Sequence, residues 1–211
     1  MISDSIETSV GAADEIVKRL MKFSEEKQLK LEETDVNEAI RRGLELLAPE
    51  IESSEVKCVL DLDDSAPAIP LAEEEFQQAL TALLRNAVFA AGEGSSAPKS
   101  VSIRTRATKL EGVGSKEGGR SGNRPRDGDS VIAIHIEDTG PGMSREDIES
   151  AFDAFFTTKA TGIGTGLGLT VAKKIIDLHK GLIRLENRED GEPGLRASIF
   201  LKTKGGLRTH V

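Results

Sequence analysis

Apolar residues recur at helical spacing near the start of the chain, from about residue 12 to residue 31. One face of this segment carries Ile16, Val17, Leu20 and Phe23. A helix with one apolar face needs a partner that covers it. Packing on the chain's own domain and pairing within a dimerising hairpin account for this pattern equally well.

A second helix is predicted to begin after Asp35. The Asp35 side chain can cap it, Glu38 stands where a capping box expects an acidic residue, and Pro49 should kink or end the run. A longer helix follows, with glutamates in its first turn and Gly92 as a natural stop. The expected elements are a helix from 35, a strand at 56–62, a helix at 72–91, strands at 100–107 and 131–137, a short helix from 144, a helix at 167–179, and strands at 182–187 and 196–202.

This order of elements predicts an α/β fold. We expect a two-layer sandwich in which a mixed sheet has helices packed on one face, preceded by the N-terminal helix. The segment 109–130 is rich in glycine and charged residues and almost free of apolar ones. Such a segment cannot bury enough surface to offset its ordering entropy, so it predicts a long disordered hairpin loop. A basic docking loop is the weaker alternative, because the charges of the segment nearly cancel.

The composition narrows the class of protein. The chain has 211 residues, of which 37% are hydrophobic and 30% are charged, and this suits a soluble globular protein with one core. It has no Trp or Tyr and a formal net charge of −8, which argues against nucleic-acid binding. Anionic ligands would therefore have to be held by local groups.

Three features predict a cytoplasmic location. Cys58 is the single cysteine, so an intrachain disulfide is excluded, and this fits a reducing compartment. The first residues lack the basic stretch and apolar run of a signal peptide. No apolar segment approaches the roughly 20 residues that cross a bilayer. A membrane segment is therefore not expected in this chain.

A polar residue, Asn86, interrupts the apolar face of the helix predicted at 72–91. A buried amide must find partners, because leaving it unpaired costs about 1–3 kcal/mol. An Asn at a helix edge that bonds to a nearby loop is the more common explanation. The alternative is an amide oxygen that ligates Mg²⁺ beside a triphosphate, since Mg²⁺ prefers hard oxygen ligands and shares them with phosphates.

A second polar segment follows a predicted strand directly. Asp138 comes at the strand end, and Gly140 and Gly142 follow it. A carboxylate here can accept a hydrogen bond from the exocyclic amine of adenine, and glycines let the backbone approach a flat base. A plain Asp-Thr-Gly turn is the simpler reading.

A third segment combines Phe152–Lys159 with the glycine-rich run 162–168, which opens a helix. Backbone N–H groups at such a turn can point at phosphate oxygens, and Lys159 can add a positive charge. The run alone is a weak signal. It lacks both the strand that leads into a Rossmann fingerprint and the Gly-Lys-Ser/Thr of a Walker loop.

Taken together and in this order, these segments closely resemble the N, G1, F and G2 boxes of sensor histidine kinases, in the Bergerat or GHKL superfamily. The matching residues are Leu83-Leu84-Arg85-Asn86-Ala87, Asp138-Thr139-Gly140-Pro141-Gly142, Phe152-Asp153-Ala154-Phe155-Phe156-Thr157-Thr158-Lys159 and Gly164-Thr165-Gly166-Leu167-Gly168-Leu169. The third segment looks most like the nitrogen-regulation subgroup. The resemblance is strong over about residues 56–202 and weaker over 13–24, which looks like the second helix of the dimerisation and phosphotransfer hairpin.

The resemblance implies a role for each matching residue. Asn86 would be the magnesium ligand, Asp138 the adenine-reading carboxylate, and Gly140 and Gly142 the formers of the base pocket. The phosphates of ATP would be covered by Thr158, Lys159, Gly162, Gly164, Thr165, Gly166, Leu167 and Gly168. The implied domains are a partial phosphotransfer helix at 1–34, an ATP-binding domain at 35–204 and a tail at 205–211, and the implied cofactors are ATP and Mg²⁺.

The chain departs from the family pattern in two places. The H box with the phosphoacceptor histidine is absent, and His135, His179 and His210 all fall in other settings, so the acceptor is expected outside this chain. Ala82 stands where topoisomerase and mismatch-repair relatives carry a Glu that activates water, so rapid hydrolysis is not expected.

The implied function is the transfer of the ATP γ-phosphate to a histidine. The implied partners are a histidine-bearing hairpin, a response regulator and a second copy bound through the N-terminal helix. A non-catalytic nucleotide-binding regulatory module and an anti-sigma-type serine kinase are the alternatives.

Overall fold

The computed structural model describes residues 29–94, 98–112, 124–159, 164–188 and 191–203 of the chain. The chain divides into two compact units, Met1–Lys30 and Leu31–Val211. The helix predicted at 12–31 lies almost entirely outside the described residues, so the fold below is that of the second unit. In the part of the chain that the structure describes, no helix is both long and apolar enough to cross a membrane.

The strands form two sheets. Their bounds are β1 Glu32–Thr34, β2 Lys57–Asp61, β3 Ile69–Leu71, β4 Ser100–Lys109, β5 Ser130–Asp138, β6 Leu182–Asn187 and β7 Leu195–Lys202. The larger sheet has the order β2-β4-β5-β7-β6, and β1 pairs with β3 in a small second sheet. Within the larger sheet, β2 runs parallel to β4, and the other neighbours are antiparallel. The sheet is therefore mixed, as the sequence predicts.

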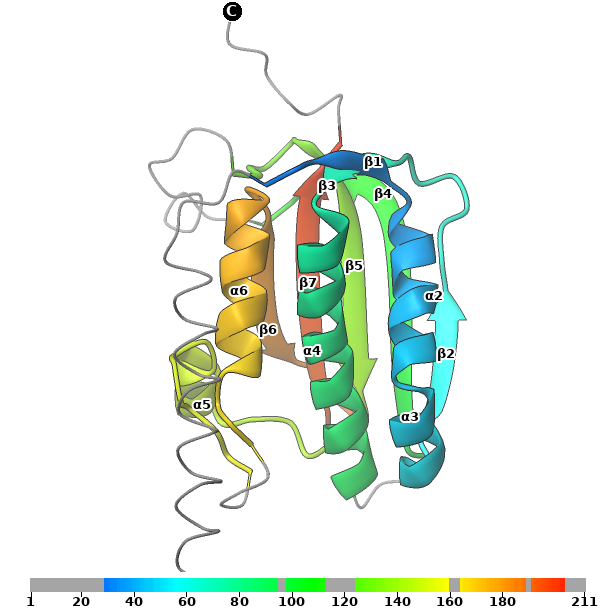
Figure 1. Cartoon of the computed structure of the whole chain (residues 1–211). Coiled ribbons are helices and arrows are strands. Elements are labelled where there is room, and N and C mark those ends of the chain that lie inside the picture. The colour runs from blue at the N-terminus through cyan, green and yellow to red at the C-terminus, as the bar shows by residue number, and fades with distance from the viewer. Residues whose placement is uncertain (1–28, 95–97, 113–123, 160–163, 189–190, 204–211) are drawn as a thin grey trace, which may run out of the picture. The chain divides into compact units, whose positions relative to one another are not determined.

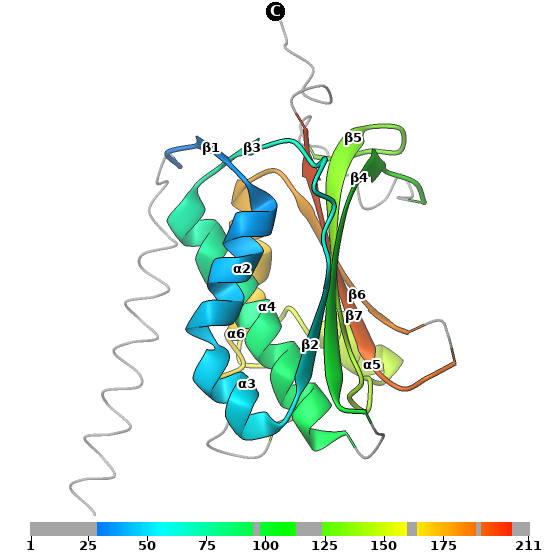
Figure 2. The same ribbon diagram turned by 90° about the vertical axis from the view of Figure 1, so that its right-hand side faces the viewer.

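Helices α2, α4 and α6 form a layer on one face of this sheet. The helix bounds are α2 Val36–Leu46, α3 Ala48–Ser54, α4 Glu73–Glu93, α5 Arg145–Ser150 and α6 Gly168–Leu178. Figure 1 shows α2, α4 and α6 side by side in front of the sheet, and Figure 2 shows from the side that they cover one face of it. The central helix α4 contacts α2, α3 and α6 as well as β4 and β5. The two-layer α/β sandwich predicted from the order of elements is confirmed.

The core lies between the two layers. It combines fully buried side chains of α4, such as Phe76, Leu80 and Leu84, with alternate residues of the central strands, such as Ile103 and Ile134. Full burial of one such side chain contributes about 1.5–3 kcal/mol. Because α4 buries its apolar stripe along most of its length, its polar residues are held at fixed places on the rim of this core.

Capping residues and a proline set several of the helix ends. Asp35 caps α2, and its Oδ1 accepts from the N–H of Asn37 at 2.8 Å. The Glu38 carboxylate accepts from Arg41 at 2.7 Å, in place of the return bond of a capping box. Pro49 stands in the first turn of α3, so it begins a new helix after α2 ends. Gly92 does not stop α4, which runs on to Glu93 and is capped at Gly94.

The hairpin between β4 and β5 is longer than predicted. Residues 113–123 of the predicted disordered loop lie outside the described residues, but its two ends are ordered. Lys109 pairs with Ser130, and the N–H of Leu110 donates to the carbonyl of Asp129 at 2.9 Å. Leu110 is buried against Val131 and Leu182. One apolar residue in a polar run is enough to extend the ordered hairpin.

Candidate nucleotide-binding site

Asp138 is the last residue of β5, and its side chain is almost fully buried, with 4% of its surface exposed. Its Oδ1 accepts from the N–H groups of Gly140 at 2.8 Å and Leu195 at 3.3 Å. Burial raises the pKa of Asp138, and these two hydrogen bonds and the charge of Arg188 act against that rise. Both hydrogen bonds given by described residues go to Oδ1, so Oδ2 is the atom that can accept from a ligand.

Gly140 lets the chain after Asp138 lie directly against α4. A Cβ at this position would stand 2.8 Å from the carbonyl oxygen of Ala90 and 2.8 Å from Asp138 Oδ1. Gly142 has a φ of 75°, and a Cβ there would stand 2.8 Å from Asn187 Oδ1. Close approach to the backbone of α4 therefore requires glycine at residue 140, and the positive φ favours glycine at residue 142.

Two residues near Asp138 were not found from the sequence. Asn187 ends β6 and holds both backbone groups of Met143, accepting from its N–H at 2.9 Å and donating to its carbonyl at 2.8 Å. Gly194 has a φ of 141°, and a Cβ there would overlap the carbonyl oxygen of Asp138. Both lie more than 40 residues from Asp138 along the chain. Their only local signals are an Asn at a strand end and a Gly after Pro193.

Asn86 and Lys159 meet on the side of α4 that faces the third segment. The Lys159 ammonium donates to Asn86 Oδ1 at 3.2 Å and lies 3.9 Å from the centre of the Phe89 ring. Burial lowers the pKa of Lys159, and the charge of Glu93 acts against that change. A loop residue thus bonds to a helix-edge Asn, as the simpler reading of Asn86 expects. The loop residue is also the cation that the resemblance places beside the phosphates.

The glycine-rich turn leads into the first turn of α6. Gly166 has a φ of 66°, its carbonyl accepts from the N–H of Phe155 at 3.0 Å, and a Cβ there would overlap the backbone of Phe155. Gly168 begins α6, and its Cβ position lies 3.8 Å from Asn86 Nδ2 and 4.0 Å from the methyl group of Ala82. The start of α6 therefore faces Asn86 and Ala82 of α4, and a side chain at residue 168 would contact both of them.

The other predicted site residues of this segment differ in their burial and in their hydrogen bonds. Leu167 caps α6 and is buried, and its N–H donates to Thr165 Oγ1 at 3.4 Å. Thr158 and Thr165 are exposed, and Gly164 is half-buried beside the Thr157 hydroxyl. Gly162 lies outside the described residues.

The structure thus brings the predicted site residues into two groups. Asp138, Gly140 and Gly142 form one group at Ala90, and Asn86, Lys159 and Gly168 form the other. Asn86 and Ala90 are four residues apart on α4, so the two groups lie along one face of this helix, about one turn apart. This arrangement suits one elongated ligand with a flat end that donates a hydrogen bond to Asp138 and an anionic end beside Lys159.

The family profile described as "Histidine kinase-, DNA gyrase B-, and HSP90-like ATPase" matches residues 71–205, which is more than half of the chain. The chain belongs to this family. The match confirms that the four boxes were correctly recognised as those of a GHKL ATP-binding domain. It does not test the roles of single residues, which stay predictions.

Curated relatives of this ATPase-family chain are sensor kinases. It is 28% identical to the sensor histidine kinase ZraS of Escherichia coli K12 over 174 residues, which are 82% of this chain and 32% of that protein. It is 28% identical to the sensor protein TdiS of Thauera aromatica over 194 residues, which are 92% of this chain and 31% of that protein. The chain thus spans about a third of the length of these relatives.

Solved structures agree on the fold of this family member. The catalytic domain of histidine kinase ThkA, in a nucleotide-free form, superposes with a TM-score of 0.63 at 26% identity and covers 82% of this chain and 95% of that one. Full-length ShkA in complex with AMPPNP has a TM-score of 0.68 at 20% identity and covers 97% of this chain and 39% of that one. The second likeness shows the fold alone.

Proposed function

We propose that this chain binds ATP with Mg²⁺ and is the catalytic domain of a two-component sensor histidine kinase that transfers the γ-phosphate to a histidine outside this chain. The observation that carries the proposal is the placement of a buried carboxylate and an amide–lysine pair along one face of α4. The names of the relatives, which are sensor histidine kinases, support the same activity.

Asp138 recognises the adenine base in this proposal. Its Oδ2 accepts from the exocyclic amine, while Oδ1 stays bonded to the N–H groups of Gly140 and Leu195. Because Asp138 is almost fully buried, a base that offers a carbonyl in place of the amine would leave the carboxylate without a donor, and that is costly. Gly140 and Gly142 have no side chains, so the base can approach the backbone closely at these positions.

Asn86, Lys159 and the start of α6 hold the triphosphate end. The amide oxygen of Asn86 is a hard ligand of the kind that Mg²⁺ takes, and the ion, when bound, neutralises phosphate charge. When the nucleotide binds, the Lys159 ammonium would donate to a phosphate oxygen and no longer to Asn86 Oδ1. Gly168 has no side chain between the first turn of α6 and Asn86, so a phosphate group could approach the first N–H groups of this helix. Thr158, Gly164, Thr165, Gly166 and Leu167 would cover the phosphates, as the resemblance implies.

Phosphoryl transfer relies on positioning and charge neutralisation more than on covalent chemistry by the protein. Ala82 lies beside Gly168 and has no group that can activate water. Slow hydrolysis would keep bound ATP available for an incoming histidine side chain. That histidine would come from a phosphotransfer hairpin, to which we assign the helix predicted within residues 1–34.

The proposal also covers the partners of this chain and its location in the cell. A histidine kinase with this fold, ThkA, has been solved in complex with the response regulator protein TrrA, at a TM-score of 0.69 and 24% identity. We propose a response regulator as the downstream partner of this chain, a second copy bound through the N-terminal helix, and a cytoplasmic location.

A phosphotransfer assay with γ-labelled ATP tests the function. The chain is mixed in turn with a hairpin that carries a family H box and with a serine-bearing substrate protein. Acid-labile label on the hairpin supports the histidine kinase, and acid-stable label on serine identifies a serine kinase. ATP binding with no label on either substrate would identify a regulatory binding module. The Asn86→Ala variant is the negative control for metal-dependent transfer.

A further inference from the structure

β2 is the edge strand of the five-stranded sheet. Figure 1 shows it at the margin of the sheet, beyond α2. Val59 and Leu60 are 44% and 43% exposed, so β2 presents apolar side chains on both of its faces. The strand contains no proline, and it pairs on one side only among the described strands. Edge strands with these properties are templates for pairing with another chain.

The direction of the backbone groups of β2 follows from one hydrogen bond. The N–H of Lys57 donates to the carbonyl of Lys99 at 3.0 Å, so the backbone groups of Lys57 point toward β4. Alternate residues of a strand point the same way, and the N–H of Asp63 continues the series by donating to Thr105 Oγ1 at 2.8 Å. The N–H and C=O groups of Cys58 and Leu60 therefore point to the free side.

We infer that β2 pairs antiparallel with β2 of a second copy about a two-fold axis at Val59, and joins the two sheets into one. In this register Cys58 faces Leu60 of the other copy, and these are the residues whose backbone groups are free. Each such pair exchanges two hydrogen bonds, and Val59 faces Val59 as a non-hydrogen-bonded pair with close side chains. Only the register centred on Val59 pairs the strand over its full length.

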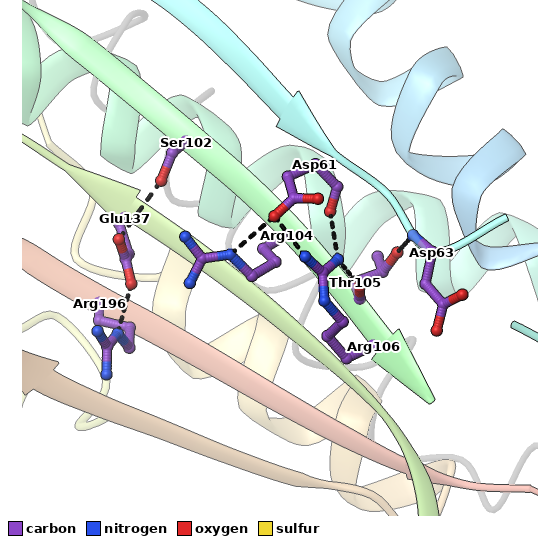
Figure 3. A network of polar contacts seen from close by, with 8 residues as sticks. All are labelled: Asp61, Asp63, Ser102, Arg104, Thr105, Arg106, Glu137 and Arg196. Atoms are coloured by element: carbon purple, nitrogen blue, oxygen red, sulfur yellow. Dashed lines mark hydrogen bonds and ion pairs between the residues drawn. The ribbon is translucent and has the colours of Figure 1, made fainter. Parts of the chain in front are cut away.

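The charges at the two ends of β2 suit the same register, because Lys57 faces Asp61 of the other copy. Figure 3 shows Asp61 between two arginines of β4. Arg104 Nε and Arg106 Nη2 both donate to Asp61 Oδ2, so Oδ1 is left for an ammonium group from the second copy. Exposed ion pairs add little binding energy, but they select the register and the orientation.

Five paired residues make a small interface, so the dimer is weak and transient by itself. Disulfide trapping detects such a species. In a Cys58→Ser background, Val59→Cys places two thiols in a pair whose Cα atoms lie about 4.5 Å apart, within disulfide range. Lys57→Cys is the register control, because its two copies would stand about 14 Å apart along the strands. Leu46→Cys on α2 controls for exposure, since Leu46 is 64% exposed.

Under mild oxidation, Val59→Cys is expected to form covalent dimer at least about tenfold faster than both controls, because pairing raises the local thiol concentration. Leu60→Pro, added to Val59→Cys, removes an N–H that points to the free side and leaves the bonds to β4 intact. It should lower the rate to that of the controls. Circular dichroism checks its fold, and Lys57→Glu, which opposes like charges, is the second disrupting variant.

Two results would overturn this dimer. One is a Val59→Cys rate no higher than the rates of the Lys57→Cys and Leu46→Cys controls. The other is a fast rate that neither Leu60→Pro nor Lys57→Glu lowers. ATP affinity is measured in the same variants and should not change, because none of the residues assigned to the nucleotide site lies on β2. Failure of the dimer is thereby distinguished from failure of the nucleotide site.

Discussion

Asp138 carries an energetic cost in the free domain that a ligand can offset. Burial raises its pKa, so ionised Asp138 disfavours the folded state at neutral pH. By linkage, its contribution to stability is favourable below the unfolded pKa and is lost as pH rises through the folded pKa. A residue that is costly to the fold and keeps one oxygen available has the character of a binding group.

Asp138→Asn is expected to weaken ATP binding about 10- to 100-fold, the size of a lost hydrogen bond to a charged group. The preference for ATP over GTP should fall with it, because an amide can donate to the guanine carbonyl. Calorimetry with both nucleotides measures this. Glu137→Gln is the matched control, since Glu137 bonds to Arg196 on the opposite face of β5. Unchanged ATP affinity in Asp138→Asn would count against its role, and the domain should stay folded.

His179 is a structural residue in the fold. Its Nε2 accepts from the N–H of Ala72 at 2.9 Å, and its Nδ1 donates to the carbonyl of Ile175 at 2.8 Å. Only the neutral ring can make both bonds. Burial is the main cause that lowers the pKa of His179 below its ordinary 6.5, against the opposing effects of the Ile175 bond and Glu75.

The stability of the domain should therefore depend on pH through His179. The unfolded state binds the proton first, so the free energy of unfolding falls as pH falls through about 6.5. Urea unfolding at about pH 7.5 and about pH 5.5 should show a shallower pH dependence in His179→Gln than in the unchanged chain. The contribution of His135 to the pH dependence is the same in both proteins and cancels when the two are compared. Equal slopes in the two proteins would exclude this role for His179.

Single residues differ in how far the sequence reveals them. Asn86 and Asp138 could be selected as candidates because Asn86 interrupts the apolar face of a predicted helix, Asp138 ends a predicted strand, and all four boxes occur in one order. Asn187 and Gly194 could not, because their role depends on contacts with Met143 and Asp138 that only the folded sheet creates. The bond between Lys159 and Asn86 joins residues 73 apart and was likewise beyond the local pattern.

At the scale of elements, two glycines in the turn before α6 have different roles: Gly166 is needed for the fold, and Gly168 is expected to be needed for nucleotide binding. Gly166 stands at a positive φ against the backbone of Phe155, whereas the Cβ position of Gly168 has only ordinary contacts. Phe155 itself has a φ of 68°, so two residues with positive φ are joined by one hydrogen bond, and only the non-glycine residue is strained. The backbone of the turn therefore requires glycine at residue 166, whereas the lack of a side chain at Gly168 leaves the side chain of Asn86 accessible from α6.

Two glycine substitutions test this division. Gly166→Ala should lower the free energy of unfolding by at least roughly 1–2 kcal/mol, because alanine is strained at positive φ and also meets Phe155. Gly168→Ala should leave stability unchanged or raised, because alanine favours a helix. It should nevertheless weaken ATP binding, because its methyl group would stand between α6 and Asn86. Urea unfolding and calorimetry measure the two effects. A stable Gly166→Ala, or a Gly168→Ala with full affinity, would contradict the assignment.

The sequence pattern predicted most elements, including the short β2 and α5, but it missed α3 as a separate helix and the strands β1 and β3. Helices α2, α4 and α6 and the four longest strands follow from apolar spacing and caps. The strands β1 and β3 have three residues each, too few for a pattern, and they form because each supplies the other's hydrogen bonds. Gly92 did not end α4, since packing of the helix on the core outweighs the weak preference of one glycine.

At the scale of the whole molecule, the sequence predicted the layers but not the order of strands. Alternating helices and strands imply a sandwich with one helical face. The parallel pairing of β2 with β4 requires a crossover through α4, and nothing in the local pattern of either strand specifies that neighbour. The crossover matters for function, because it places α4 in the middle of the helical layer, where both groups of site residues meet it.

The fold also accounts for the described histidines. His135 lies within β5, where Nδ1 bonds to Ser198 Oγ at 2.9 Å and the ring packs on Phe200. His179 follows the far end of α6, about 16 Å from Gly168 at roughly 1.5 Å per residue. His210 lies outside the described residues. Both described rings are engaged in contacts that a phosphoacceptor would have to break.

The chain supplied with ATP and Mg²⁺ alone is therefore expected to form no acid-labile label on His135 or His179. In-line transfer tolerates little misplacement, and an error of about 1 Å can cost roughly a hundredfold in rate. A separate hairpin that carries an H box should acquire the label in trans, and the Asn86→Ala variant should not support it. Peptide mapping after brief exposure to γ-labelled ATP locates any phosphate. Strong label on His179 or His135 would mean that the helical layer or the sheet opens to bring its own histidine to the nucleotide, and this division between donor domain and separate acceptor would then be wrong.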